Sequence, residues 1–153
     1  MPPTSPKQLP PLVRITNRIV VPLLRLGVPI GPMYLLTVTG RQSGLPRTTP
    51  VATFEFEGKR YLMQAIPKAN WVANARAAGW GILGRGFRRP RVTLVEVPVE
   101  ERAVMLRHAG SIAPAVLRRQ FLETGLIESL EAESFTAAAP RIAVFRIEKR
   151  PGR

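Results

Sequence analysis

The chain has no cysteine and a single histidine, His108, among its 153 residues. The absence of cysteine excludes disulfides, thiolate catalysis and cysteine-bound metal, and it is compatible with a reducing compartment. A histidine-based metal site or a Ser-His-Asp triad would have to depend on that one histidine, which disfavours both kinds of site. No metal centre is therefore expected.

The chain also lacks a long apolar run that is free of charge. Its first apolar stretch, residues 9–28, contains three arginines and three prolines. A membrane-spanning helix needs about 20 mostly apolar residues, and a secretory signal has no charges within its apolar core. We therefore expect a cytoplasmic protein, with the cytoplasmic face of the membrane as the alternative location.

Acidic residues are few: the chain has 10 of them against 23 lysines and arginines, and its net charge is +13. Such an excess attracts nucleic acid, anionic lipid or a phosphate-rich small molecule. A soluble protein that merely has a basic surface is also compatible with this composition. Charge alone does not choose among these possibilities.

The pattern of apolar residues predicts one domain built mainly from antiparallel strands. Residues 1–11 are expected to form a flexible N-terminal arm, and residues 12–150 a single domain. Helices are expected at 12–26, 70–78 and 99–109, followed by a helical, proline-interrupted stretch to about residue 130. Strands are expected at 34–39, 47–57, 60–66, 80–83, 91–97 and 141–148. Asn70 is expected to cap the second helix, and Gly79 to end it. Six strands with hairpin links favour an antiparallel barrel decorated with helices over a doubly wound sheet.

The loop from Thr39 to Pro50, TGRQSGLPRTTP, carries the most distinctive pattern. Gly40 and Gly44 permit tight turns that leave backbone amides exposed. Arg41 and Arg47 supply fork-shaped donors that match a phosphate group, and nearby hydroxyls add further donors. The loop therefore predicts an anion-binding concavity without a Walker motif. A β-turn with solvated arginines is the alternative interpretation.

The segment LLTVTGRQSGLPRTTPV resembles the signature of the deazaflavin-dependent nitroreductase and quinone-reductase family, whose members are actinobacterial. The resemblance continues in residues 70–76 (NWVANAR), which are similar to the family's W-x-x-N helix, and in residues 92–97 (VTLVEV). It implies a split β-barrel related in fold to the FMN-binding pyridoxamine-phosphate oxidases. It also implies reduced coenzyme F420 (F420H2) as the hydride donor.

The resemblance implies coenzyme-binding roles for a set of residues along the loop, the third strand and the following helix. They are Arg41, Gln42, Ser43, Arg47, Thr49, Pro50, Val51, Ala65, Ile66, Pro67, Lys68, Trp71 and Asn74. The first four would hold the coenzyme's phosphate, the next three would line the ring pocket, and residues 65–68 would lie against the deazaflavin ring and substrate. Trp71 and Asn74 would share a helical face toward the coenzyme. Lys68 is the one candidate proton donor, with a solvated surface lysine as the alternative.

The implied activity is hydride transfer from F420H2 to a small organic acceptor, namely a quinone, an activated alkene or a nitro compound. The chain departs from the family at several positions. Gln42 replaces a second basic residue, and residues 66–68 replace a Ser-Lys-Gly-Gly stretch. The family's nitro-reducing members carry tyrosines in a C-terminal helix, whereas this chain has only Tyr34 and Tyr61, both in expected strands. The acceptor is therefore left open.

Two alternative functions remain. One is an FMN- or haem-binding split-barrel protein, and the other is a basic binding module for nucleic acid or anionic membrane without catalysis. The helix Leu12–Leu26 is compatible with peripheral membrane contact, although core packing is favoured. Nucleic acid is not expected as a partner, because few aromatic residues are interleaved with the basic ones. A monomer and a homodimer both fit the sequence.

Overall fold

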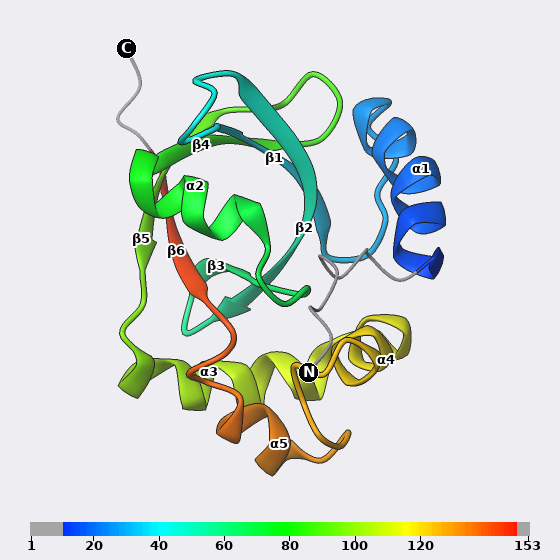
Figure 1. The fold of residues 1–153 in the computed structure, drawn as a ribbon, viewed down its shortest axis with the longest axis vertical. Helices are drawn as coiled ribbons and strands as arrows, with labels where there is room; N and C mark the ends of the chain where they lie inside the picture. The colour runs from blue at the N-terminus through cyan, green and yellow to red at the C-terminus, as the bar shows by residue number, and fades with distance from the viewer. Residues whose placement is uncertain (1–10, 150–153) are drawn as a thin grey trace, which may run out of the picture.

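The computed structural model describes residues 11–149, and it describes side chains from residue 18 onward. The expected N-terminal arm lies outside the described residues except for Pro11, which begins the first helix. Figure 1 shows the helices arranged around a β-barrel. The helices are α1 (Pro11–Arg25), α2 (Asn70–Ala78), α3 (Val99–Ile112), α4 (Ala115–Glu123) and α5 (Ala132–Ala137), and the strands are β1 (Met33–Thr39), β2 (Pro46–Phe56), β3 (Lys59–Met63), β4 (Trp80–Gly84), β5 (Arg91–Glu96) and β6 (Val144–Lys149).

The strands close into one barrel in the order β1-β2-β3-β6-β5-β4, and every neighbouring pair is antiparallel. Three hairpins join sequential strands, and β6 closes the barrel between β3 and β5. Leu62 of β3 lies opposite Phe145 of β6, and Val95 of β5 lies opposite Arg146. The expected mostly antiparallel barrel is thereby confirmed.

Apolar side chains form two clusters because strand residues alternate between the two faces of the sheet. Inside the barrel, Leu36, Leu62 and Phe145 pack with residues of α2. On the outer face, Phe54 of β2 packs with residues of α3, α4 and α5, among them Phe121. Helix α2 therefore packs its apolar residues against the barrel interior, whereas the three later helices cover the outside of the sheet (Figure 1).

Helix α2 covers one end of the barrel and begins at Asn70, so its N-cap lies one residue before the expected one. Ala69 occupies the N-cap position and makes no side-chain cap hydrogen bond, so the expectation that Asn70 caps the helix is wrong. Gly79 ends the helix as expected, because its φ of 74° is left-handed and its N–H donates to the carbonyl of Ala75 at 2.8 Å.

Two strands are shorter than expected, and Gln64 explains both differences. β3 ends at Met63 and not at residue 66, and β6 begins at Val144 and not at residue 141. The Gln64 side chain accepts a hydrogen bond from the N–H of Ala143 at 3.0 Å and donates one to the carbonyl of Ile66 at 2.9 Å. Its side chain thus takes over the strand ladder, and the chain turns away from the sheet.

Helix α1 packs beside β1 and β2 through its last turns, where Leu24 is fully buried. Its end is tied to the β4–β5 hairpin by a hydrogen bond from the N–H of Gly86 to the carbonyl of Leu24 at 2.8 Å. Arg18, Ile19 and Leu26 are exposed. Over residues 11–149, no helix has the length and apolar character needed to cross a membrane.

Candidate functional site

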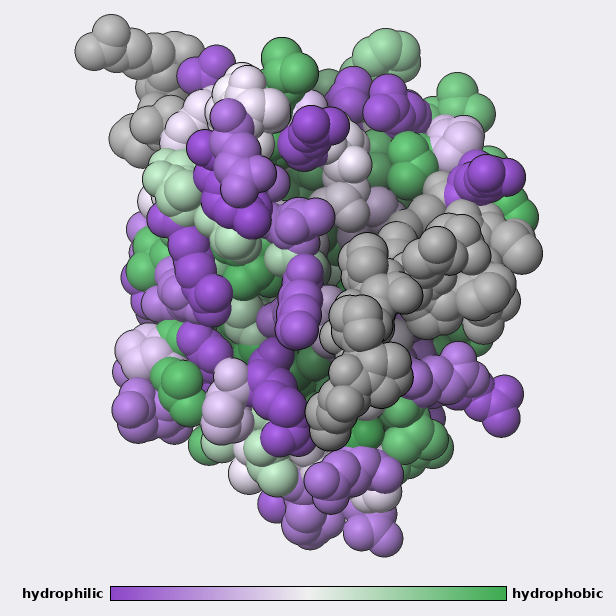
Figure 2. All heavy atoms as spheres, viewed as in Figure 1, coloured by the Kyte–Doolittle hydropathy of each residue, from purple (hydrophilic) through white to green (hydrophobic). Residues whose placement is uncertain are grey.

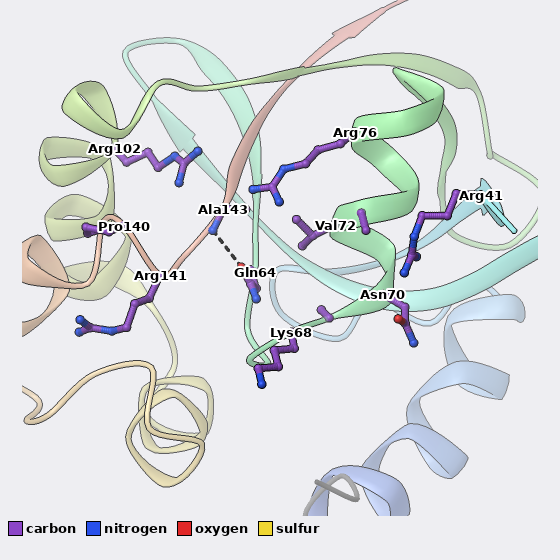
Figure 3. Close-up of a pocket in the computed structure, with 12 residues that line it drawn as sticks. Arg41, Gln64, Lys68, Asn70, Val72, Arg76, Arg102, Pro140, Arg141 and Ala143 are labelled. Atoms are coloured by element: carbon purple, nitrogen blue, oxygen red, sulfur yellow. Dashed lines mark hydrogen bonds between the residues drawn. The ribbon is translucent and has the colours of Figure 1, made fainter. Parts of the chain in front are cut away.

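A cavity of about 360 Å³ lies beside α2, between the loop that precedes this helix and the turn that leads into β6. Its lining comes from segments that are far apart in the sequence (Figure 3). The lining residues are Arg41, Gln64, Lys68, Ala69, Asn70, Val72, Ala73, Arg76, Arg102, Pro140, Arg141 and Ala143. The fold therefore joins the loop after β1 to α2, α3 and the start of β6 around one hollow.

The cavity is strongly basic. Arg41, Lys68, Arg76, Arg102 and Arg141 line it, and none of its lining residues is acidic. In Figure 3, Arg76 and Arg102 extend toward each other from α2 and α3, and Lys68 projects from the loop before α2. Figure 2 shows hydrophilic side chains over much of the face that carries α2. Cations that converge in this way attract an anionic ligand.

Glu96, at the end of β5, holds two of these arginines in place. Its carboxylate accepts hydrogen bonds from Arg76 at 2.6 to 3.0 Å and from Arg102 at 3.1 Å. The hydrogen bond with Arg76 lowers the pKa of Glu96 below its usual range, against the opposing effect of burial, and it raises the pKa of Arg76. One carboxylate is thus shared by two guanidinium groups, and a positive charge remains at the cavity wall.

Arg102 is buried, with 6% of its surface exposed. Its guanidinium also donates to the carbonyls of Val97 at 2.7 Å and of Ala139 at 3.3 Å. Because a buried charge is tolerated only when it is paired and hydrogen-bonded, these contacts and Glu96 fix its position. Arg102 therefore supplies a fixed positive charge, whereas Arg41 and Lys68 are exposed to a ligand.

Asn74 of α2 ties the distinctive loop to the helix. Its side-chain oxygen accepts hydrogen bonds from the backbone N–H of Arg41 at 3.1 Å and from the Arg41 guanidinium at 2.9 Å. Asn74 has only 5% of its surface exposed. It therefore acts on the loop by positioning Arg41 at the edge of the cavity.

Most of the loop's backbone amides are already used within the protein. Gly40 donates to the carbonyl of Leu45 at 2.8 Å, and Gly44 donates to that of Gly40 at 2.9 Å. Leu45 donates to the hydroxyl oxygen of Ser43 at 3.2 Å. A Cβ on Gly40 would come within 2.7 Å of that same oxygen, so a larger residue here would displace the Ser43 hydroxyl. Anion binding at the loop thus depends mainly on side chains, and the Ser43 hydroxyl still has its proton to donate.

Lys68 has a strained backbone and lies at the cavity. Its φ of 54° is in the left-handed region, which a residue other than glycine adopts uncommonly. Such conformations persist only where the surrounding structure enforces them, and they are concentrated at functional sites. The strain places the exposed lysine side chain at the cavity wall, directly before α2.

The other expected site residues are not in the lining of this cavity. Among the exposed or half-buried ones are Gln42, Ser43, Arg47, Thr49, Pro50, Ala65, Ile66 and Pro67. Val51 is buried inside the barrel. The ring of Trp71 is half-buried and lies against that of Phe145, with 5.6 Å between the ring centroids. Of the residues expected from the sequence, the structure therefore places Arg41 and Lys68 in the cavity wall.

Sequence reasoning missed Gln64, Arg76, Arg102 and Arg141. A signal existed for Arg76, because residues 69, 72, 73 and 76 have the i, i+3, i+4, i+7 spacing of one helical face. We instead assigned the face of Trp71 and Asn74 to the coenzyme. No local pattern marks Arg102 or Arg141, because tertiary folding alone brings these residues to the cavity.

A family model described as F420H(2)-dependent quinone reductase matches residues 14–124. That match covers well over half of the chain, and the barrel and the basic cavity are both consistent with it. The chain therefore belongs to the F420H(2)-dependent quinone reductase family. It is accordingly an oxidoreductase whose coenzyme is reduced F420, as the sequence resemblance implied.

Solved structures resemble the chain at low sequence identity. An Agrobacterium tumefaciens protein of unknown function matches with a TM-score of 0.50 and 18% identity, over 96% of this chain and 59% of that one. A structure named F420-H2 dependent reductase (FDR-A) matches with a TM-score of 0.44 and 22% identity, over 76% of this chain and 94% of that one. A Clostridium acetobutylicum protein of the pyridoxinephosphate oxidase family matches with a TM-score of 0.48 and 9% identity, over 78% of this chain and 75% of that one.

At these identities the likenesses concern the fold alone, and the expected antiparallel barrel decorated with helices is shown by the strand topology. A search of curated proteins finds no match.

The lining of the cavity fits such a coenzyme. F420 carries a phosphate and an acidic tail, and the cavity offers guanidinium and ammonium groups with no lining acid. Arginine donors match phosphate and carboxylate geometry. Arg41, Lys68 and Arg76 are exposed and would contact these anionic groups, while Arg102 would add a fixed charge behind them.

Proposed function

We propose that the chain transfers a hydride from F420H2 to a quinone or an activated alkene, with the coenzyme's anionic part held in the basic cavity beside α2. The convergence of five cationic lining residues next to the loop of Arg41 carries this proposal. When bound, the coenzyme supplies the hydride. The chain's own residues then bind the coenzyme, orient it and exclude water.

The loop after β1 is proposed to hold the phosphate through Arg41, Gln42, Ser43 and Arg47, all of which are exposed. Asn74 is a positioning residue in this proposal, since its buried oxygen bonds Arg41. The remaining assignments follow the family motif. Thr49, Pro50 and Val51, the stretch Ala65–Lys68, and Trp71 are proposed to surround the deazaflavin ring.

Lys68 is the proposed proton donor to the reduced acceptor. Its side chain is exposed at the cavity wall, and its strained backbone fixes where that side chain emerges. An ammonium group at this point would also stabilise negative charge that develops on the acceptor oxygen. The side chain thereby has a use in both ligand binding and chemistry.

The positions of the two tyrosines favour a quinone or an alkene over a nitro compound. Tyr61 is buried and stacks on Phe54, with 5.4 Å between the ring centroids. Tyr34 does not line the cavity. Its ring lies against the guanidinium groups of Arg60 and Arg85. The phenol groups that nitro-reducing relatives use are therefore not at this site.

Peripheral membrane contact through residues 12–26, cytoplasmic localisation, and the choice between monomer and homodimer stay predictions. Within α1, Leu24 packs into the core while Ile19 and Leu26 are exposed. This arrangement is compatible with both the core-packing role and the membrane role of the helix.

A coenzyme titration tests the proposed function. The protein is titrated with F420, FMN and NADPH while fluorescence is followed, and oxidation of F420H2 is then measured with a soluble quinone, an activated alkene and a nitroaromatic compound. We expect saturable binding of F420 alone and turnover with the quinone or the alkene. Binding of FMN but not F420 would favour the FMN-binding alternative. Steeply salt-dependent binding of DNA or anionic liposomes, without any coenzyme, would favour a binding module.

A further inference from the structure

The barrel opens between β3 and β6, on the side away from the coenzyme cavity. β3 pairs with β6 only from Tyr61, opposite Arg146, to Met63. β6 nevertheless continues to pair with β5 as far as Lys149, which lies opposite Val92. Lys59 and Arg60 therefore pair with β2 alone, and residues 147–149 pair with β5 alone. The pairing between β3 and β6 therefore ends at this point, while the barrel stays closed through the three pairs from Tyr61 to Met63.

A second cavity, of about 460 Å³, fills this opening. Its lining residues are Gly58, Lys59, Arg60, Leu83, Pro90, Val92, Arg146, Ile147, Glu148 and Lys149. Leu83 and Val92 belong to the apolar barrel interior, and Ile147 packs against the same cluster. The cavity thus has an apolar floor.

The rim of this cavity is cationic. Arg146 is paired with Glu148, with 2.7 Å between their nearest nitrogen and oxygen atoms. Lys59, Arg60 and Lys149 also line the cavity, and no salt bridge is formed by these three within the described part of the chain. After Glu148 is matched with Arg146, the rim therefore keeps an excess of positive charge.

Arg60 extends from the rim toward the barrel interior and meets a second arginine there. Its guanidinium carbon lies 4.8 Å from the ring centroid of Tyr34, and that of Arg85 lies 4.1 Å from the same ring. Arg85 also donates to the Tyr34 hydroxyl at 2.7 Å, yet its Nη1 is buried without a hydrogen-bond partner among the described residues. Arg85 does not line the cavity, whereas Arg60 does, and two like charges near one ring favour an anion close to Arg60.

This second cavity is separate from the coenzyme cavity. The two share no lining residue. The second cavity lies at the start of β3 and the end of β6, whereas the coenzyme cavity lies beyond Met63 and before Val144. A ligand of one cavity would not contact the residues of the other.

We propose that the opening between β3 and β6 binds a small anionic amphiphile, a carboxylate carried on an apolar body. The carboxylate contacts Arg60 and Lys59, and the apolar body lies on Leu83, Val92 and Ile147. The cavity volume is within the range of roughly 300 to 1,000 Å³ that is typical of ligand pockets with an apolar lining and a few polar groups. A neutral hydrocarbon would leave the cations unmatched, and a small inorganic anion would leave the apolar floor uncovered. The proposal is independent of the coenzyme site.

An NMR titration of methyl-labelled protein with decanoate tests this site directly. We expect saturable shifts of the methyl groups of Leu83, Val92 and Ile147, while those of Val72 at the coenzyme cavity stay unchanged. Decanol supplies the apolar body alone and acetate supplies the head alone, and both are expected to shift these signals far less. Absence of saturation at the three residues, equal shifts with decanol, or a response at Val72 instead would each overturn the proposal.

Two variants test the assigned contacts. Arg60→Gln is expected to weaken decanoate binding by about tenfold or more, because it removes a charge-assisted contact. Arg18→Gln, on the exposed face of α1, removes the same charge and should leave the affinity unchanged. Ile147→Trp fills the cavity and should abolish binding while F420 affinity is retained. Unchanged decanoate affinity in folded Arg60→Gln, or in folded Ile147→Trp, would contradict the assignment.

Discussion

Single residues decide how the loop after β1 presents its charge. Asn74 is the clearest case, because one buried side-chain oxygen accepts from both the backbone and the guanidinium of Arg41. Asn74 thus acts by holding Arg41, and both residues belong to the family motif. Lys68 shows a different principle, since a strained backbone directs its side chain to the cavity.

Replacing Asn74 with leucine keeps a branched side chain, although a bulkier one, and removes the acceptor. The variant should lose about 1 to 3 kcal/mol of unfolding free energy, because a buried donor is left without a partner. Coenzyme affinity should fall as well, since Arg41 is no longer held. Urea unfolding and coenzyme titration measure the two effects. Asn70→Leu, at an exposed position of the same helix, is the control and should change stability by about 0.5 kcal/mol or less. Equal stability of the two variants would count against the positioning role.

Replacing Lys68 with asparagine separates charge from backbone strain. Asparagine tolerates the left-handed region, so the unfolding free energy should stay within about 0.5 kcal/mol of the wild type. Coenzyme affinity and turnover should both fall, because the ammonium group is lost from the cavity wall. Full activity of Lys68→Asn would show that the lysine is only a solvated surface residue.

The loop motif could be predicted from sequence because its parts are contiguous. Gly40, Arg41 and Ser43 are close together along the chain, and the close approach of Gly40 to the Ser43 hydroxyl is local. Arg102 and Arg141 could not be predicted, because their place at the cavity depends on how α3 and the turn before β6 pack on the barrel. A buried arginine in a helix looks like a surface residue until its partners are known.

At the scale of elements, Glu96 links α2, β5 and α3. It ends β5 and receives hydrogen bonds from Arg76 of α2 and Arg102 of α3. The carboxylate is partly exposed, whereas Arg102 is buried. The ion pairs therefore fix the relative placement of two helices that line the coenzyme cavity.

Glu96→Gln should destabilise the protein by about 1 to 2 kcal/mol at pH 7, a value reduced by the partial exposure of the carboxylate. The pKa of Glu96 is lowered in the folded protein, chiefly by its hydrogen bond with Arg76. The stability that ionised Glu96 contributes is thus fully present above the pKa of glutamate in the unfolded chain, about 4.3. This stability is lost as the pH falls through the lower pKa of Glu96 in the folded protein. The difference between wild type and variant, measured by urea unfolding, should shrink below about pH 4.

Glu148→Gln is the matched control for this pH dependence. Glu148 is exposed and pairs with Arg146 alone, so its removal should cost less than about 1 kcal/mol. A wild-type-minus-variant difference for Glu96→Gln that stays constant between pH 7 and pH 3 would contradict the proposed role of the ion pairs.

The elements themselves were largely predictable from the sequence, and their ends were not. All six strands were expected within a few residues, because alternation and turn residues are local signals. The errors in the predicted ends of β3 and β6 arise from Gln64. Its side chain accepts the hydrogen bond from the N–H of the distant Ala143 that a longer strand would have received through its backbone. The expected proline interruption is Pro114, which precedes α4, whereas the short helix α5 lies beyond the helical stretch that we expected.

At the scale of the whole molecule, charge is distributed unevenly along the chain. The first acidic residue is Glu55, and residues 58–95 contain none. The segment from α1 to β5 therefore carries most of the basic groups, although Arg102, Arg141, Arg146 and Lys149 of the two cavities lie after it. Most acidic residues are in α3, α4 and α5 and the turns between them. A barrel of this kind draws anionic ligands to itself, and the sequence composition predicted that tendency without locating the sites.

The central claim is that the basic cavity beside α2 holds the anionic part of F420, and direct titration of Arg41→Ala tests it. The variant should bind F420 about 10- to 100-fold more weakly, which corresponds to a lost charge-assisted contact of about 1.5 to 3 kcal/mol. Arg18→Ala, which removes an equal charge from the exposed face of α1, should bind like the wild type. An unchanged dissociation constant in a folded Arg41→Ala protein would contradict the account.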